Sequence, residues 1–179
     1  MQPSRYPAWL PALLLAGALA GADGAAAQGW HTLTGADKSF SVELPAEPLH
    51  TASELRTGAG APYTMHQYEL DEGDFAYVVE TAIYPDEVNF ASPRANLQGG
   101  LDFAAKGMAG GRWASVEWLT HQGYPAVSAV GDRRVSTVRW FGVLAGRRII
   151  ILTYAGPPGS AHAPDVDRFM GSLRLDPSP

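Results

Sequence analysis

The sequence YPAVSAVGDRRVSTVRWFGVLAGRRIIILTY, residues 124–154, predicts three consecutive antiparallel strands joined by two tight turns. The turns are Gly131-Asp132-Arg133-Arg134 and Ala145-Gly146-Arg147. Gly and Asp tolerate the positive φ that tight hairpins require, and strands joined this closely must run antiparallel. The third strand carries the unbroken apolar run 149–152. A continuous apolar run indicates a strand that is covered on both faces.

Further strand patterns lie on both sides of this stretch. Apolar and polar residues alternate with a period of two, which is the repeat of a strand with one buried face. Pro and Gly punctuate the segments, and proline cannot donate to a sheet ladder. The predicted strands are residues 40–44, 50–56, 62–70, 75–84 and 112–121.

Two segments have helical periodicity instead. Ser92-Pro93 predicts a helix start in which the serine caps free N–H groups and the proline occupies the first turn. The apolar stripe that follows is Leu97, Leu101, Ala104 and Met108. Gly99 and Gly100 each cost about 1 kcal/mol in such a helix, so it depends on packing. A second helix begins at Pro164, with the stripe Val166, Phe169, Met170 and Leu173.

Strands and helices do not alternate along the chain, so the order predicts an α+β fold and not a doubly wound parallel sheet. We expect a largely antiparallel sheet of about six to eight strands. Two amphipathic helices and strands covered on both faces predict helices on both faces of the sheet, an α/β/α sandwich.

The first residues resemble a secretory signal peptide. Arg5 precedes the apolar stretch 8–22, and Ala25-Ala26-Ala27 supplies small residues for cleavage. We expect residues 1–27 to be removed, residues 28–179 to form a single domain, and the product to be periplasmic or secreted; an uncleaved anchor is the alternative. The chain has no cysteine, which removes thiolate metal sites and redox chemistry. Its net charge of −5 argues against nucleic acid as a partner.

The order of elements resembles the PsbP-like fold, a group that includes the extrinsic lumenal subunit of photosystem II, a Ran-binding nuclear import factor and small exported bacterial proteins. The segments that carry the resemblance are FSVELPAEP (40–48), GRRIIILTY (146–154) and PDVDRFMGSLRL (164–175). They report packing and not catalysis. The resemblance therefore implies a non-catalytic binding or assembly module, and binding to a photosystem is not implied.

One set of polar residues is brought together by the predicted topology. The turns at 121–125 and 145–148 fall at the same end of the sheet, so His121, Tyr124 and Arg147 are expected on one rim. A cation, an imidazole and a phenol there suit an anionic or carbonyl-bearing ligand. The alternative is that these are ordinary turn residues and that the arginine side chain is solvated.

Two other groups of residues have a structural reading beside a functional one. Asp71, Glu72 and Asp74 present carboxylates suited to Ca²⁺, but Asp and Gly also belong in a solvated hairpin turn. Trp113 and Trp118, expected on opposite faces of their strand, and Trp140 are either a stacking platform or core under a helix. The five histidines are scattered, so we expect no metal site and no cofactor.

The leading hypothesis is an exported, monomeric, non-catalytic binding or assembly module of the bacterial envelope, with an envelope protein or a small ligand as its partner. The alternatives are a small hydrolase or lyase that uses the rim of His121, Tyr124 and Arg147, and a carrier of a small apolar ligand between helix and sheet. A deep pocket with titratable groups favours the enzyme, and an apolar cavity favours the carrier.

Overall fold

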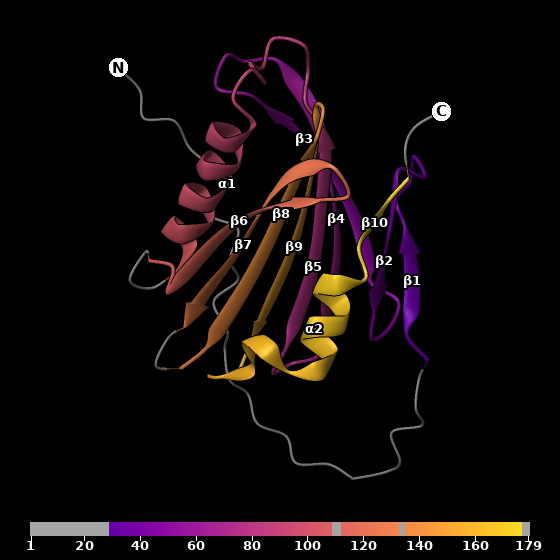
Figure 1. The fold of residues 1–179 in the computed structure, drawn as a ribbon. Helices are drawn as coiled ribbons and strands as arrows, with labels where there is room; N and C mark the ends of the chain where they lie inside the picture. Colours follow the sequence, from indigo (N-terminus) through magenta and orange to yellow (C-terminus); the bar gives the residue numbers. More distant parts are fainter. Residues whose placement is uncertain (1–28, 109–111, 133–134, 177–179) are drawn as a thin grey trace, which may run out of the picture.

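The computed structural model describes residues 29–108, 112–132 and 135–176. The predicted signal peptide, residues 1–27, lies outside these ranges. Within them the chain forms a seven-stranded sheet and a three-stranded sheet, called here the large and the small sheet. Figure 1 shows the large sheet with α1 (Pro93–Gly107) beside it and α2 (Pro164–Gly171) in front.

The large sheet is antiparallel throughout, and the three strands predicted within residues 124–154 are neighbours in it. Its central strand is β9, flanked by β5 and β8. Ile150 and Leu152 are fully buried in the apolar cluster on one face and Ile149 is buried in the cluster on the other, which confirms the prediction that this strand is covered on both faces. The spatial order is β3 (Leu49–Arg56), β4 (Pro62–Asp71), β5 (Ala76–Ile83), β9 (Arg148–Gly156), β8 (Thr137–Ala145), β7 (Tyr124–Asp132) and β6 (Ser115–His121).

The small sheet was not predicted as a separate layer. It consists of β1 (His31–Thr34), β2 (Phe40–Leu44) and β10 (Arg174–Leu175), with β2 in the middle. The pairing of Arg174 with Ser41 and of Leu175 with Phe40 joins the two ends of the described chain. Such a two-residue strand has no local sequence pattern of its own.

The two faces of the large sheet bury different clusters of apolar side chains. On one face α1 packs on β7 and β8, where Leu97 and Leu101 are fully buried with Val127 and Trp140. On the other face lie α2 and the small sheet, and Phe40, Phe169 and Ile150 are fully buried there. The predicted arrangement of helical layers on both faces therefore needs correction, because a strand layer shares the second face with an eight-residue helix.

Both helices begin with proline at their first turn, as the sequence predicted. Ser92 occupies the position before α1, but its side chain makes no capping hydrogen bond; its carbonyl instead accepts from Ala95 and Asn96. Asn89 organises the preceding loop, since its side chain accepts from the Ala91 N–H and its carbonyl accepts from Asn96 Nδ2. No helix among the described residues has the length and apolarity needed to cross a bilayer.

Candidate functional site

A groove of about 360 Å³ lies between α1 and the large sheet, and we call it the α1 groove. Its walls are mainly aromatic and aliphatic, and polar groups stand at its mouth. A concave apolar site with few polar groups is the usual form of a small-molecule site. The walls include Tyr63, Tyr84, Phe90, Trp140, Leu144 and Ile149, and the mouth includes Arg56, Thr57 and Asn96.

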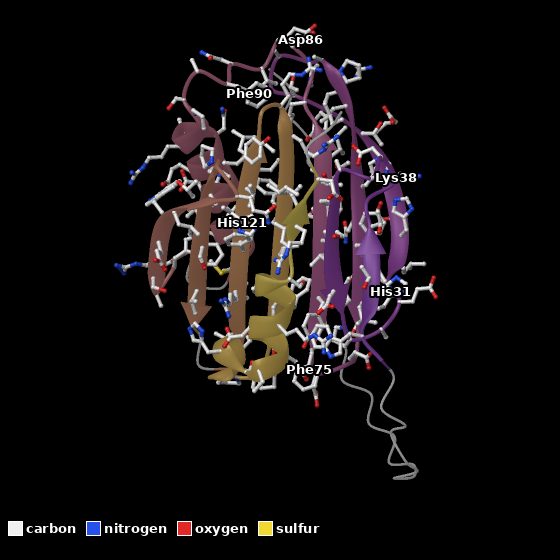
Figure 2. All side chains as sticks on the ribbon, turned by 45° about the vertical axis from the view of Figure 1, so that its right-hand side comes forward. His31, Lys38, Phe75, Asp86, Phe90 and His121 are labelled. Atoms are coloured by element: carbon white, nitrogen blue, oxygen red, sulfur yellow. The ribbon has the colours of Figure 1, made fainter. Side chains whose placement is uncertain are left out.

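Three elements that are distant in sequence form the α1 groove. The tip of the β3–β4 hairpin brings Arg56 to the mouth, where Arg56 Nη1 donates to the Gly60 carbonyl at 2.8 Å. The loop between β5 and α1 carries Phe90 (Figure 2). That loop is tied to the sheet where the Tyr84 N–H donates to the Arg147 carbonyl at 3.0 Å. The central strands supply the floor.

The aromatic walls are arranged as tilted rings and not as a closed stack. The rings of Tyr63 and Tyr84 lie 4.8 Å apart at 46°, and those of Tyr84 and Phe90 lie 6.2 Å apart at 44°. Trp140 lies at the base, 3% exposed and packed beneath α1. These rings offer faces and edges to a further ring, which is a favourable contact for aromatic ligands.

Two glycines give Trp140 its place. A Cβ on Gly142 would lie 2.3 Å from Trp140 Cη2, so the indole occupies the space above this glycine. A Cβ on Gly100 of α1 would meet Trp140 Cζ2 at 3.6 Å, an ordinary contact, and Gly100 also lines the α1 groove. The absence of a side chain on the helix at Gly100 keeps this part of the groove open.

The titratable groups near the α1 groove are shifted toward their neutral forms. Burial, followed by the charge of Tyr63, raises the pKa of Tyr84 to about 12. Burial also raises the pKa of Tyr63. Glu80 of β5 lies near both tyrosines, since its charge acts on each of them, and burial followed by the charge of Glu69 raises the pKa of Glu80. The tyrosines are therefore neutral donors and walls, not bases.

The three residues predicted to form a rim do lie at the same end of the sheet, but they make separate contacts. His121 and Tyr124 are register partners at the turn between β6 and β7. Arg147 forms an ion pair with Asp86 in the β5–α1 loop. Figure 2 shows Asp86 and His121 well apart on the molecule. Ligand binding by His121, Tyr124 and Arg147 stays a prediction.

His121 is a structural contact between the large sheet and the segment after α2. Its Nε2 lies 3.2 Å from the Leu173 carbonyl. Its ring packs against that of Phe141 in a T-shaped arrangement, with the ring centroids 5.4 Å apart. Gln122 Nε2 donates to the same carbonyl at 3.1 Å. Burial lowers the pKa of His121, and the nearby charge of Arg174 acts in the same direction.

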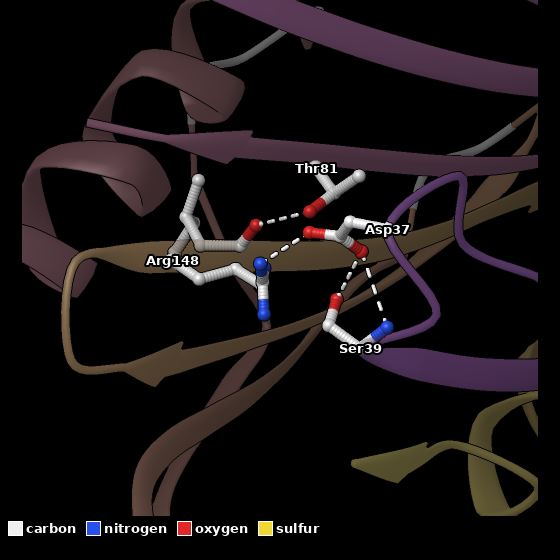
Figure 3. A network of polar contacts seen from close by, with 5 residues as sticks. Asp37, Ser39, Thr81 and Arg148 are labelled. Carbon is white, nitrogen blue, oxygen red and sulfur yellow. Dashed lines mark hydrogen bonds and ion pairs between the residues drawn. The ribbon is translucent and has the colours of Figure 1, made fainter. Parts of the chain in front are cut away.

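A second hollow of about 290 Å³ lies on the opposite face, where the β1–β2 turn meets β4, β5 and β9. Arg148 pairs there with Asp37, whose Oδ1 accepts from the Ser39 N–H at 3.1 Å and the Ser39 hydroxyl at 2.5 Å (Figure 3). The Thr81 hydroxyl donates to the Ile149 carbonyl at 3.0 Å. Most of these polar groups are already satisfied within the protein, which favours a structural role.

The predicted tryptophan platform is divided by the structure. Trp113 precedes β6, so it does not follow the alternation of the strand, and Trp113 and Trp118 both pack on the α1 side and not on opposite faces. Trp113 Nε1 donates to the Leu101 carbonyl at 3.2 Å, and Arg94 lies 4.4 Å over the Trp118 ring. Only Trp140 reaches the α1 groove.

In the acidic turn after β4, a side-chain carboxylate accepts a hydrogen bond from the backbone of the turn itself. Asp71 Oδ1 accepts from the Gly73 N–H at 2.8 Å, and Gly73 has a φ of 77°, which fits the reading as a tight turn. Among the described residues, no three His, Cys, Asp or Glu side chains lie close enough together to hold a metal ion.

Comparison with known proteins gives the fold. No protein-family model and no curated protein matches the sequence. The solution structure of cyanobacterial PsbP (CyanoP) from Synechocystis sp. PCC 6803 is similar, with a TM-score of 0.55, 11% identity, and coverage of 89% of this chain and 100% of CyanoP. The crystal structure of PA94, a Pseudomonas aeruginosa protein of unknown function, matches with a TM-score of 0.46 and 15% identity. The match covers 83% of this chain and 99% of PA94. The resemblance inferred from the sequence is confirmed at the level of architecture: the chain has a PsbP-like fold.

Proposed function

We propose that the protein is a non-catalytic binding module of the bacterial envelope, and that its ligand occupies the α1 groove. The α1 groove itself carries the proposal, because it joins a mainly apolar interior to polar groups at its mouth. The tyrosines at its wall have raised pKa values, and Asp86 in the nearby loop is paired with Arg147. This arrangement supplies contact area and orientation instead of a general base.

Export belongs to the same proposal. The positive start, the short apolar stretch and the alanine triplet at residues 25–27 support removal of residues 1–27 and a periplasmic or secreted product. The module then acts as a monomer of residues 28–179, and its partner is a small envelope ligand or the apolar part of an envelope protein. N-terminal sequencing of the protein purified from a bacterial envelope fraction should start at Gln28.

Binding is tested with N-phenyl-1-naphthylamine, a neutral aromatic probe whose fluorescence rises in apolar surroundings. The mature protein should bind it, and Gly100→Leu should abolish binding because the new side chain fills the space next to Trp140. Gly99→Leu is the matched control, because a side chain at the neighbouring helix position points into open space. Equal probe binding by both variants would contradict the proposal.

Folding of the variants is checked separately. Both substitutions replace glycine inside a helix and should preserve or raise the melting temperature. Should Gly100→Leu unfold the protein, Gly100→Ala provides a milder version, since a single Cβ makes an ordinary contact with Trp140. A folded Gly100→Ala variant should bind the probe more weakly than the parent protein does.

A further inference from the structure

We propose that the ligand of the α1 groove is a compact aromatic anion, with its ring system between the aromatic walls and its anionic head against Arg56. This inference rests on the proposed function and specifies the chemistry of the ligand. It follows from the shape of the groove, the character of its walls and the distribution of charge at its mouth.

The dimensions of the α1 groove favour a short, flat ligand. Its volume of about 360 Å³ is near the lower end of the range for small-molecule sites, roughly 300–1,000 Å³. Tyr63, Tyr84, Phe90 and Trp140 surround it with rigid rings, and Trp140 is held from below by the sheet and from above by α1. Rigid aromatic side chains lose little conformational entropy when they bind another ring.

The mouth of the α1 groove carries an arginine that is available for an anion. Arg56 uses Nη1 for the Gly60 carbonyl, and an arginine has five N–H donors. Among the described residues no carboxylate pairs with Arg56, whereas Arg139, Arg147, Arg148 and Arg168 all have such partners. The planar guanidinium suits the paired oxygens of an anionic head group.

Other polar groups at the mouth are compatible with an acceptor-rich head. Asn96 donates through Nδ2 to Asn89, and the Thr57 hydroxyl accepts from the Ala61 N–H at 3.1 Å. The acidic side chains near the groove do not compete strongly. Asp86 is paired with Arg147, and burial raises the pKa of Glu80, which favours its neutral form.

The experiment compares two probes that differ by one sulfonate. These are N-phenyl-1-naphthylamine and its anionic derivative 8-anilino-1-naphthalenesulfonate, titrated into the mature protein by fluorescence. The anion should bind more tightly than the neutral probe by up to about fivefold, the contribution expected of one solvent-accessible charge pair. Arg56→Gln should remove this preference by weakening the binding of the anion more than that of the neutral probe.

Two further variants separate charge from general binding. Arg56→Lys keeps the charge but loses the forked donor geometry, so it should retain part of the preference. Arg94→Gln is the matched control, because Arg94 lies over Trp118 outside the α1 groove, and it should bind both probes as the parent protein does. Gly100→Leu should abolish the binding of both probes.

The possible results distinguish the two proposals. Binding of both probes with equal affinity, unchanged in Arg56→Gln, would overturn the anionic ligand and leave the binding function intact. Displacement of the anionic probe by thioflavin T, a flat aromatic cation, at lower concentration than by a neutral competitor would show that the groove prefers a cation and would also overturn the anionic ligand. Failure of both probes to bind, or binding that Gly100→Leu does not affect, would overturn the function itself.

Discussion

Arg148, the first residue of the central strand β9, forms an ion pair with Asp37 in the turn between β1 and β2. The two residues are 111 positions apart in the chain, and their contact joins the large sheet to the small sheet. The Asp37 carboxylate also accepts the N–H and hydroxyl of Ser39 (Figure 3). Burial raises the pKa of Asp37, but the Ser39 hydrogen bonds and the Arg148 charge outweigh it and the pKa lies below its ordinary value.

Asp37→Asn should lower the free energy of unfolding by roughly 0.5–1 kcal/mol at pH 7, a modest loss because the Asp37 side chain is 45% exposed. The Asp37 carboxylate is protonated more readily in the unfolded chain than in the folded chain. The stabilisation by this carboxylate is therefore present above the unfolded pKa and is lost as pH falls through the lowered folded pKa. Urea unfolding at several pH values measures this difference.

The neighbouring ion pair provides the control for Asp37. Asp86 pairs with Arg147, but its side chain is 89% exposed, and Asp86→Asn should not measurably change the urea midpoint. An equal decrease in the free energy of unfolding in the two variants would show that the ion pair between the sheets stabilises the protein no more than an exposed ion pair does.

A second prediction concerns His121, whose pKa is lowered by burial. The unfolded chain binds the proton more tightly than the folded chain does, so protonation favours unfolding. The free energy of unfolding should therefore fall as pH drops below the ordinary histidine pKa of about 6.5, and the loss should be complete once the folded pKa has been passed. His121→Gln should remove this part of the pH dependence in thermal melts between pH 8 and 5.

Gln122→Asn separates titration from simple bond loss. Its shorter side chain should give up the hydrogen bonds to Leu173 and Leu175 while tolerating the positive φ of 49° at this position. Because the His121 imidazole stays in place, the variant should keep a pH-dependent melting temperature, although loss of the 3.0 Å contact between Gln122 Nε2 and His121 Nε2 should shift the pH at which it changes. A parent-like pH profile for His121→Gln would mean that another group is responsible.

The sequence predicted the parts of this fold that depend on local periodicity. The period of two in residues 40–44 and the isoleucine run at 149–152 identified β2 and β9, because burial of one or both faces leaves a mark on each strand. It could not identify β10, whose two residues pair with β2 across the whole domain. That pairing depends on where α2 docks, which is a tertiary property.

The candidate site was harder to predict, for a geometric reason. His121 and Arg147 do lie at one end of the sheet, yet β6 and β9, the strand that Arg147 precedes, are three strands apart, about 14 Å at the usual strand spacing. Topology gives the end of a strand but not this lateral separation. The α1 groove combines a hairpin tip, a loop and a helix, and the sequence had singled out two of its residues: Trp140, one of the three tryptophans of the predicted platform, and Gly100, a costly helix residue.

Phe169→Ala tests whether α2 is a structural part of the second face. Phe169 is 0% exposed, and its ring meets Tyr77 edge-on at 5.2 Å. Loss of a fully buried phenylalanine typically costs about 3–5 kcal/mol, out of the roughly 5–15 kcal/mol that stabilise a domain. The variant should therefore be marginally stable in a thermal melt. Phe103→Ala is the control, because Phe103 is 72% exposed on α1 and its loss should barely move the transition.

Gly142→Ala and Gly100→Ala should change stability in opposite directions, although each adds one methyl group near Trp140. At Gly142 the new Cβ would lie 2.3 Å from Trp140 Cη2, so the indole must leave its place between α1 and the sheet, at a cost of about 1–3 kcal/mol. At Gly100 the Cβ makes an ordinary contact at 3.6 Å, and alanine improves helix propensity by up to about 1 kcal/mol. Tryptophan fluorescence should change in the first variant, and its melting temperature should fall while that of the second rises. If both variants were destabilised to the same extent, the space around Trp140 would be tight on the helix side as well, and a groove open beside Gly100 could not be maintained.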